Sequence, residues 1–187
     1  ISILSVFIYL LFSNFTYSEI TSYQFILSNI DAIRNLKEEN FLILFISFFF
    51  LVILWVLLLG FGSPLALLSG FVFGKWLGSI FIVLSLSIGA TFLYILSRYF
   101  FYNLIKNIFM KKFISLVKKF KKNEFIYFLI YRFIGGIPFG VANVLPVLFN
   151  IGVKNYFIGT FIGLFPQLFV MVSLGSGIET ILQKNNQ

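Results

Sequence analysis

Few side chains in this chain of 187 residues could carry out chemistry. There is no cysteine and no histidine, so thiolate nucleophiles, the commonest general base and the usual zinc ligands are missing from the sequence. The acidic residues are few and scattered: Glu19, Asp31, Glu38, Glu39, Glu124 and Glu179. Hydrolysis, phosphoryl transfer and metal-dependent catalysis have little to work with. We therefore predict a protein that is not an enzyme and that holds no metal and no cofactor.

One apolar stretch does carry residues suited to binding an anion. The segment Tyr131–Ile151 reads YRFIGGIPFGVANVLPVLFNI and places an arginine, glycines, prolines and asparagines among hydrophobic side chains. An arginine inside a membrane is costly and marks a functional site by default, and its planar guanidinium suits phosphate. Arg132 is therefore the leading candidate for a lipid head-group site, with Asn143 as a further polar contact. The alternative is that Arg132 pairs with Glu124 or Glu179, or caps the carbonyls of a broken helix.

The composition is that of a membrane protein. Hydrophobic residues make up 60% of the chain, its mean hydropathy is +1.03, and 11% of its residues are charged, against about 25% in soluble domains. We therefore predict an all-α integral membrane protein with one membrane domain over residues 41–178. The net charge of +8 is expected to face anionic lipid head groups in the cytoplasmic leaflet, and not nucleic acid.

The two ends of the chain are predicted to flank this domain, as an N-terminal part over residues 1–40 and a polar tail over residues 179–187. Residues 1–12 are apolar but too short to span alone, and with further residues before them they would form a first membrane helix. The alternative is a cleaved signal peptide, although no small-residue cleavage site is evident near Ser13. Within residues 18–40 an amphipathic helix on the membrane is predicted, because apolar side chains recur at helical spacing. These side chains are Ile20, Tyr23, Leu27, Ile30 and Ile33.

The first interrupted segment follows a run of apolar residues, 41–60, that is long enough for a spanning helix. We predict a re-entrant hairpin over about residues 61–75, because a helix of about 10 residues cannot cross about 30 Å of hydrocarbon. The alternative is a kinked extension of the preceding helix. The residues expected to shape the hairpin are the N-cap Ser63, Pro64 at the first helical position, the small Gly70, and Gly74, which ends the helix.

An uncharged helix and a basic segment come next. Residues 76–97 carry no charge and are followed by Arg98. This arginine either assists the head-group site from one end or extends its charged group to the interface. Residues 103–123 place apolar side chains on one helical face and lysines largely on the other, which predicts an amphipathic helix in the cytoplasmic interface. The lysines expected to contact anionic lipid are Lys111, Lys112, Lys118, Lys119 and Lys122.

The second interrupted segment covers about residues 133–152 and is predicted to form a second re-entrant hairpin. The last long apolar element is expected to break near its middle, at Gly159, Gly163 and Pro166. Each half of the chain thus has an apolar run, a proline-started broken segment, a lysine and a long helix. This pattern predicts an inverted-repeat bundle whose two opposing hairpins meet at the site. The residues expected to shape the second hairpin are Gly135, Gly136, Pro138 and Phe139.

The ordered blocks PLALLSGFVFGKWLGS, GATFLYILSR, YRFIGGIPFGVANVL and FIGLFPQ resemble the VTT-domain superfamily, also called the DedA or SNARE-associated Golgi protein family. The resemblance covers roughly residues 41–178. It implies two re-entrant hairpins that face each other inside a helical bundle. It also implies lipid scrambling, as in eukaryotic members, or envelope homeostasis and carrier-lipid recycling, as in bacterial ones. The residues that match the family pattern are Gly89, Ala90, Arg98, Arg132, Pro138, Phe139, Asn143, Gly163 and Pro166.

These observations predict a protein of the bacterial inner membrane that moves phospholipid or a lipid-phosphate carrier between leaflets and so supports membrane homeostasis. An ion- or proton-coupled transporter of a small solute is the alternative. Proton coupling is disfavoured because residues 40–123 contain no acid, whereas several family members carry embedded acids near the first hairpin. A second alternative is a structural factor that organises anionic lipid through its lysines. The oligomeric state is open, a homo-oligomer included.

Overall fold

The computed structural model describes residues 37, 39–58, 60–120, 122–134 and 136–185, without the side chains of residues 115, 116, 118, 119 and 182–185. It divides into two units between Phe45 and Ile46, and the elements described below lie in the second unit, apart from the first five residues of α4. The membrane helix and the amphipathic helix predicted within residues 1–40 lie outside the described residues, apart from 37, 39 and 40. The described part of the chain is helical and contains no strand, which confirms the all-α prediction.

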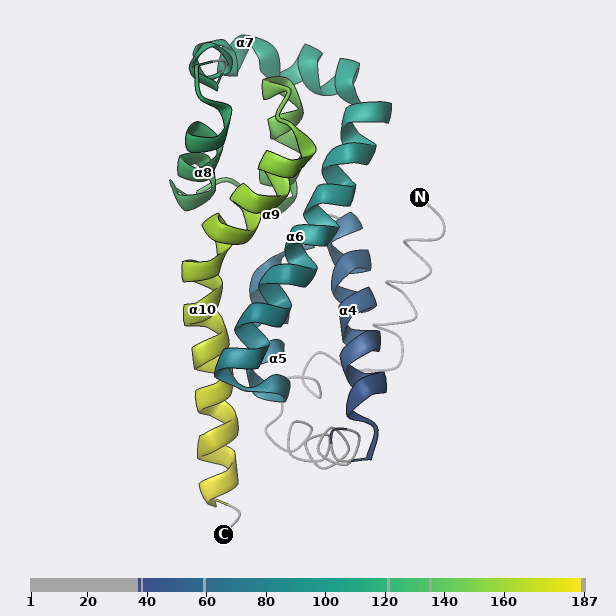
Figure 1. Cartoon of the computed structure of the whole chain (residues 1–187), viewed down its shortest axis with the longest axis vertical. Helices are drawn as coiled ribbons and strands as arrows, with labels where there is room; N and C mark the ends of the chain where they lie inside the picture. Colours follow the sequence, from purple (N-terminus) through teal and green to yellow (C-terminus); the bar gives the residue numbers. More distant parts are fainter. Residues whose placement is uncertain (1–36, 38, 59, 121, 135, 186–187) are drawn as a thin grey trace. The chain divides into compact units, whose positions relative to one another are not determined.

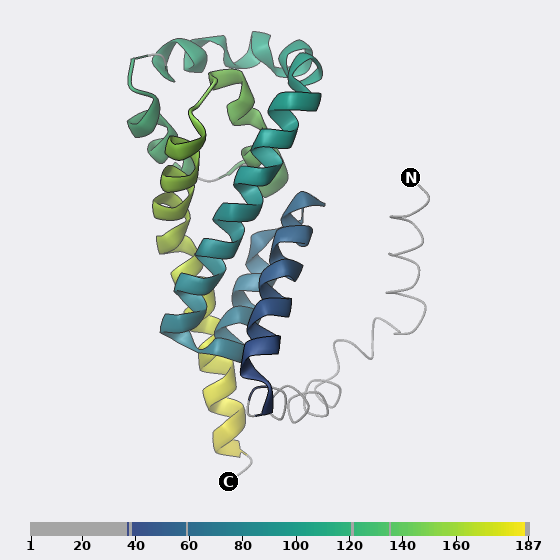
Figure 2. The same ribbon diagram turned by 45° about the vertical axis from the view of Figure 1, so that its right-hand side comes forward.

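The shorter elements pack around two long helices, α6 and α10 (Figure 1). Both are long and apolar enough to cross a membrane, over Lys75–Phe100 and Val153–Ile181. Figures 1 and 2 show that α5 runs between one end of the bundle and mid-height, while α7 crosses the other end and α8 returns from it to mid-height. The elements are α4 (Phe41–Leu57), α5 (Gly62–Phe73), α6 (Lys75–Phe100), α7 (Tyr102–Phe120), α8 (Glu124–Ile134), α9 (Phe139–Val144), the 3-10 helix η1 (Leu145–Phe149) and α10 (Val153–Asn185).

Helix α4 starts at Phe41 as predicted and ends at Leu57, three residues before the end of the predicted helix over residues 41–60. The chain turns back because the Gly60 N–H donates to the Trp55 carbonyl at 2.9 Å, while the Trp55 indole N–H donates to the Phe61 carbonyl at 2.9 Å. A Cβ on Gly60 would collide with the indole ring, so a larger residue there requires the ring to move. Since α5 then runs back beside α4 (Figure 2), the kinked-extension alternative is wrong.

Helix α5 begins at Gly62, two residues earlier than predicted. Its N-cap is Phe61, which makes no side-chain capping bond, so the assignment of Ser63 as N-cap is wrong, and Pro64 occupies the third helical position. The physical reason is that the first four N–H groups of a helix have no partner within it, so a proline fits anywhere in the first turn and does not fix the start. Gly74 ends α5 as predicted, with φ 77°.

Helices α5 and α10 cross at backbone contact, which gives Gly70 its structural role. A Cβ on Gly70 would collide with the Val172 carbonyl, and a Cβ on Gly175 would collide with the Leu67 carbonyl. Small residues allow helices in lipid to approach this closely, where dispersion and weak hydrogen bonds replace the hydrophobic effect as the source of association. The crossing fixes α5 against the lower half of α10.

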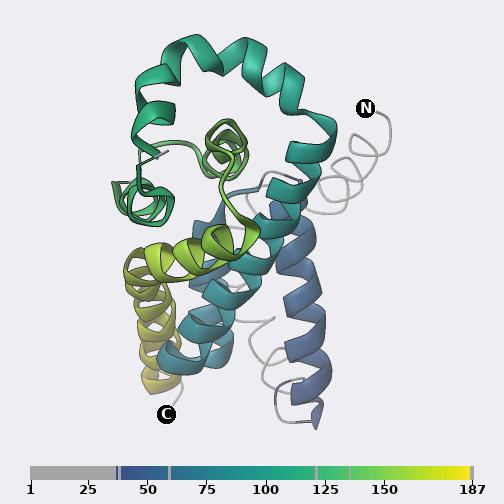
Figure 3. The ribbon, with the colours of Figure 1, turned by 45° about the horizontal axis from the view of Figure 1, so that its top comes forward.

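Helix α10 is one continuous helix with Pro166 inside it, so the predicted break at Gly159, Gly163 and Pro166 is wrong. A proline within a helix removes one backbone hydrogen bond and clashes with the carbonyl four residues earlier, which bends the helix without ending it when neighbouring helices support it. Figure 3 shows this bend, where the light green first part of α10 and its yellow remainder run in different directions. The middle of α10 thereby lies next to the start of α5 and to the α8–α9 turn.

Helix α7 divides its side chains as the lysine pattern predicted. Its apolar face lies against η1, where the Phe120 and Phe149 rings stack at 4.1 Å. The apolar side chains on this face, buried or half-buried, are Ile105, Phe109, Phe113, Val117 and Phe120. The exposed lysines are Lys106, Lys111, Lys112 and Lys122, while the side chains of Lys118 and Lys119 lie outside the described part of the chain. Protein therefore covers this apolar face, so the face is not free to insert into lipid as an interfacial helix would.

The second interrupted segment is a turn between α8 and α9. Gly136 adopts φ 76°, a conformation that glycine reaches without strain, and α9 begins directly after its N-cap Pro138, as predicted. Gly135 lies outside the described residues. After η1, Asn150 takes a left-handed conformation with φ 53° and turns the chain into α10. The α4–α5 turn and the α8–α9 turn lie at similar heights in Figure 2.

Candidate functional site

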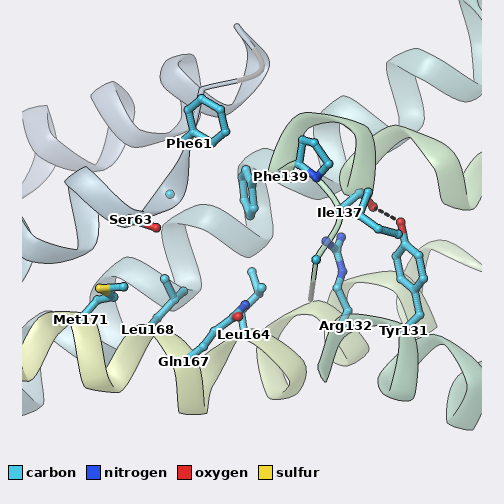
Figure 4. Close-up of a pocket in the computed structure, with 14 residues that line it drawn as sticks. Phe61, Ser63, Tyr131, Arg132, Ile137, Phe139, Leu164, Gln167, Leu168 and Met171 are labelled. Atoms are coloured by element: carbon cyan, nitrogen blue, oxygen red, sulfur yellow. Dashed lines mark hydrogen bonds between the residues drawn. The ribbon is translucent and has the colours of Figure 1, made fainter. Parts of the chain in front are cut away.

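A cavity of about 410 Å³ lies where the start of α5 meets the α8–α9 turn. In Figure 4, side chains from α10 form one wall, while Phe61 and Phe139 lie across from them. Arg132 is the single charged residue in this lining, which otherwise combines Ser63, Tyr131 and Gln167 with apolar groups. The lining residues are Phe61, Gly62, Ser63, Tyr131, Arg132, Gly136, Ile137, Pro138, Phe139, Ala142, Leu164, Gln167, Leu168 and Met171.

Arg132, in the last turn of α8, is only 4% exposed. Its Nη1 donates to the Asn143 side-chain oxygen at 2.9 Å, and its Nη2 donates to the Tyr156 hydroxyl at 2.7 Å. Its Cζ lies 5.1 Å from the ring centre of Phe128 and 5.1 Å from that of Tyr156, within the range of a cation–π contact. The structure thus brings together Arg132 and Asn143, the two residues that the sequence placed at a head-group site.

Three helices meet in a closed set of hydrogen bonds around Arg132. The Tyr156 hydroxyl, which accepts from Arg132, donates in turn to the backbone carbonyl of Asn143 at 2.9 Å. The three residues come from α8, α9 and α10, and Asn143 and Tyr156 are fully buried. Next to this set, the Tyr131 hydroxyl donates to the Ala142 carbonyl at 3.1 Å and ties α8 to α9 a second time (Figure 4). The guanidinium is therefore held from two sides in a buried position.

Glycines on α10 allow α8 to lie close enough to place Arg132. A Cβ on Gly163 would collide with the Cβ of Arg132, and a Cβ on Gly159 would lie 2.7 Å from Cδ1 of Phe128. No side chain larger than hydrogen fits at Gly163 unless α8 moves. The role of Gly163 is therefore a contact under the site, and not the helix break that the sequence pattern indicated.

Two donors of the site have no protein partner. Arg132 Nε and Asn143 Nδ2 are buried and make no hydrogen bond to the described residues. Buried polar groups are normally paired, because leaving one unpaired costs about 1–3 kcal/mol. Both atoms are N–H donors, so a group that satisfies them must offer acceptor atoms. With a positive charge beside them, the arrangement is suited to binding an anion.

The acids proposed as partners of Arg132 lie elsewhere. Glu124 accepts a hydrogen bond from the backbone N–H of Gly152 at 3.0 Å and another from the Asn155 amide, so its carboxylate caps the start of α10. Glu179 lies 16 residues beyond Gly163 on α10, about 24 Å along the axis at 1.5 Å per residue. The prediction that Arg132 forms a salt bridge with either acid is therefore wrong.

Arg98 is not brought to the cavity. It lies exposed in the last turn of α6, beside the Tyr94 hydroxyl, and is not among the cavity-lining residues. Tyr94 itself donates to the Ile151 carbonyl at 2.6 Å and stacks its ring on Tyr156. Its exposed position at the end of α6 matches the alternative interpretation of Arg98 as a side chain at the membrane interface.

Sequence reasoning missed Tyr156 and Gln167. Both are polar side chains within the long uncharged run of α10, and a polar group in such a run requires a partner or a cavity. Tyr156 has Arg132 as its partner, and Gln167 lines the cavity. That signal is visible in the sequence, but it does not reveal which partner or which cavity.

The described part of the chain is all-helical and combines two apolar helices of spanning length with an internal polar site. The profile of the VTT domain matches residues 60–177, which is more than half of the chain. The chain belongs to this family, whose members are membrane proteins. This confirms the resemblance found in the sequence blocks.

One curated relative is a Transmembrane protein 41 homolog from Dictyostelium discoideum. It is 28% identical over 158 residues, an alignment that covers 81% of this chain and 46% of the relative. The chain therefore spans slightly less than half the length of the curated relative that it matches. No solved structure matches the chain.

Proposed function

We propose that this protein moves phospholipid, or a lipid-phosphate carrier, between the two leaflets of a membrane, and that the cavity holds the phosphate. The observation that carries the proposal is the charge of Arg132, which lines the cavity while it is 4% exposed and bonded to neutral groups. A buried charge without a counter-charge is strongly unfavourable. A phosphate that enters the cavity neutralises this charge and supplies an acceptor oxygen to the unpaired Arg132 Nε.

The size and lining of the cavity support a head group and not a whole lipid. A volume of about 410 Å³ lies at the lower end of the range for small-molecule sites. Most of the lining is apolar, and its polar groups are Arg132, Gln167, Ser63 and the Tyr131 hydroxyl. The acyl or isoprenoid chains would stay in the surrounding lipid while the head group passes. The main barrier to lipid movement is the transfer of the charged phosphate through hydrocarbon, and this site lowers that barrier.

The two interrupted segments would form the path as opposing re-entrant hairpins. Helix α5 has 12 residues and α8 has 11, so each is about 17–18 Å long and reaches roughly halfway through about 30 Å of hydrocarbon. Their turns both contribute to the cavity lining, and the arms approach it from opposite ends of the bundle (Figure 1). This arrangement supports an inverted repeat with the site near the membrane midplane.

The exposed lysines of α7 would contact anionic head groups on the cytoplasmic side of a bacterial inner membrane. Because η1 covers the apolar face of this helix, the lysines and not that face would hold it to lipid. Movement of lipid would be passive and would involve no chemical step. Among the described residues, no group of three acids, histidines or cysteines could hold a metal ion, and no acid lines the cavity to relay protons.

The test is exchange of lipid between leaflets of proteoliposomes, measured with a head-group-labelled phospholipid and an external quencher. Arg132→Gln is expected to slow exchange by about tenfold to a hundredfold, because it removes a charged hydrogen bond worth about 1.5–3 kcal/mol. Arg98→Gln is the matched control, since it removes an equal charge from an exposed position outside the cavity lining. We expect it to exchange lipid at nearly the wild-type rate.

Three results would overturn the proposal. Equal loss in Arg98→Gln and Arg132→Gln would mean that total charge matters and the cavity does not. A well-folded wild type that exchanges neither phospholipid nor a labelled lipid-phosphate carrier would exclude lipid movement and favour a small solute. Loss of function only in a variant with the exposed lysines Lys111, Lys112 and Lys122 neutralised would favour a structural factor that organises anionic lipid.

A further inference from the structure

The Tyr156 side chain makes two kinds of contact: its ring stacks on other aromatic rings, and its hydroxyl forms hydrogen bonds. The ring lies between that of Tyr94, at 4.3 Å and 14°, and that of Phe128, at 5.0 Å and 27°. The hydroxyl accepts from Arg132 Nη2 and donates to the Asn143 carbonyl. The stack of rings fixes the position of the side chain, while the hydroxyl uses one hydrogen bond as acceptor and one as donor to contact Arg132 and Asn143.

We propose that Tyr156 is a positioning residue whose hydroxyl orients the Arg132 guanidinium for an anion in the cavity, an inference that rests on the proposed function. A guanidinium carries five N–H donors in a rigid planar fork. Asn143 and Tyr156 engage one donor each, on two different terminal nitrogens. Two fixed points on a rigid plane define its orientation, so the remaining three donors are held in place before a ligand arrives.

Removal of the hydroxyl would leave the guanidinium with one side-chain hydrogen bond. The bond to Asn143 alone allows the plane to rotate, while the Phe128 and Tyr156 rings at 5.1 Å restrain its position but not the direction of its N–H groups. The Asn143 carbonyl would lose a donor at the same time. Preorganised donors bind an anion better because they lose less orientational freedom on binding.

Tyr156→Phe tests this inference because it keeps the ring in the stack and removes only the hydroxyl. Tyr94→Phe is the matched control: it alters the neighbouring ring of the same stack, but its hydroxyl donates to the Ile151 carbonyl and not to Arg132. The readout is the side-chain ¹⁵N spectrum of the full chain labelled at arginine. The chain has three arginines, Arg34, Arg98 and Arg132, so the spectrum of Arg132→Lys identifies the signals of interest.

In the wild type and in Tyr94→Phe, we expect the two Nη groups of Arg132 to give separate, slowly exchanging signals, because each is held by a different partner. In Tyr156→Phe these signals should average together. Lipid exchange in Tyr156→Phe should fall by about tenfold, the effect expected for loss of one hydrogen bond to a charged group. Lipid exchange in Tyr94→Phe should stay near the wild-type rate.

The inference is overturned if Arg132 gives the same signals in Tyr156→Phe as in the wild type. It is also overturned if Tyr156→Phe exchanges lipid normally while Arg132→Gln does not. If the wild type moves no lipid at all, the proposed function fails by itself. The arginine spectra then still decide whether the Tyr156 hydroxyl fixes the orientation of Arg132.

Discussion

Replacement of Gly163 by alanine would show whether α10 sets the position of Arg132. The added methyl group would collide with Cβ of Arg132 and would lie 3.3 Å from its Cγ and 3.7 Å from its Cα. The Cβ and Cα atoms are fixed to the backbone of α8, so a change of side-chain rotamer cannot clear the collision. Helix α8 must move away from α10, and the guanidinium must move with it.

Two opposing effects set the magnitude. Alanine favours a helix over glycine by about 1 kcal/mol, while overpacking of a tight interior contact costs about 1–3 kcal/mol. The free energy of unfolding should therefore fall by about 0–2 kcal/mol. The displacement also lengthens the bonds from Arg132 to Asn143 and Tyr156, now 2.9 and 2.7 Å. Because misplacement by about 1 Å can reduce a rate by about a hundredfold, we expect lipid exchange to slow by at least about tenfold.

The assay compares Gly163→Ala with Gly177→Ala for stability and for lipid exchange. Gly177 lies on the same helix, is exposed, and has open space where a Cβ would be added. It should therefore show the gain in helix propensity without the collision, with wild-type exchange. If Gly163→Ala matches Gly177→Ala in both measurements, the contact between α10 and Arg132 is loose, and our account of how the site is held is wrong.

Two further predictions concern the frame around the site. Gly175→Ala places a methyl group on the Leu67 carbonyl, a backbone atom that cannot move aside. The cost of overpacking, less the gain in helix propensity, should lower the free energy of unfolding by about 0–2 kcal/mol. Chemical unfolding in micelles measures this, and a gain in stability would contradict the close crossing of α5 and α10. Trp55→Phe removes the indole hydrogen bond to the Phe61 carbonyl and should destabilise the α4–α5 turn by about 1 kcal/mol. Backbone amides should then exchange faster in that turn but not in α7. Equal amide protection of the turn in Trp55→Phe and in the wild type would show that the bond is dispensable.

The sequence by itself determined the class of protein and the main residues of its site. Composition and uncharged runs indicated helices in a membrane, because a bilayer leaves the backbone few other ways to satisfy its hydrogen bonds. Arg132 and Asn143 were identifiable because a charge and an amide within an apolar segment are costly unless they are used. Gly74, Pro138 and the two-faced basic segment were also correct, since caps, turns and helical periodicity depend on a few neighbouring residues.

Only the tertiary structure decided how these residues are arranged. Tyr156 bonds to Arg132 across 24 positions, and Gly163 contacts it across 31, so no local pattern connects them. Pro166 reads as a break in the sequence, yet packing of α10 against α5, α6 and α8 keeps the helix continuous and only bent. Local patterns report where a helix is favoured, while the crossing points of helices depend on which small residues meet. The site exists because α8, α9 and α10 meet at such a point.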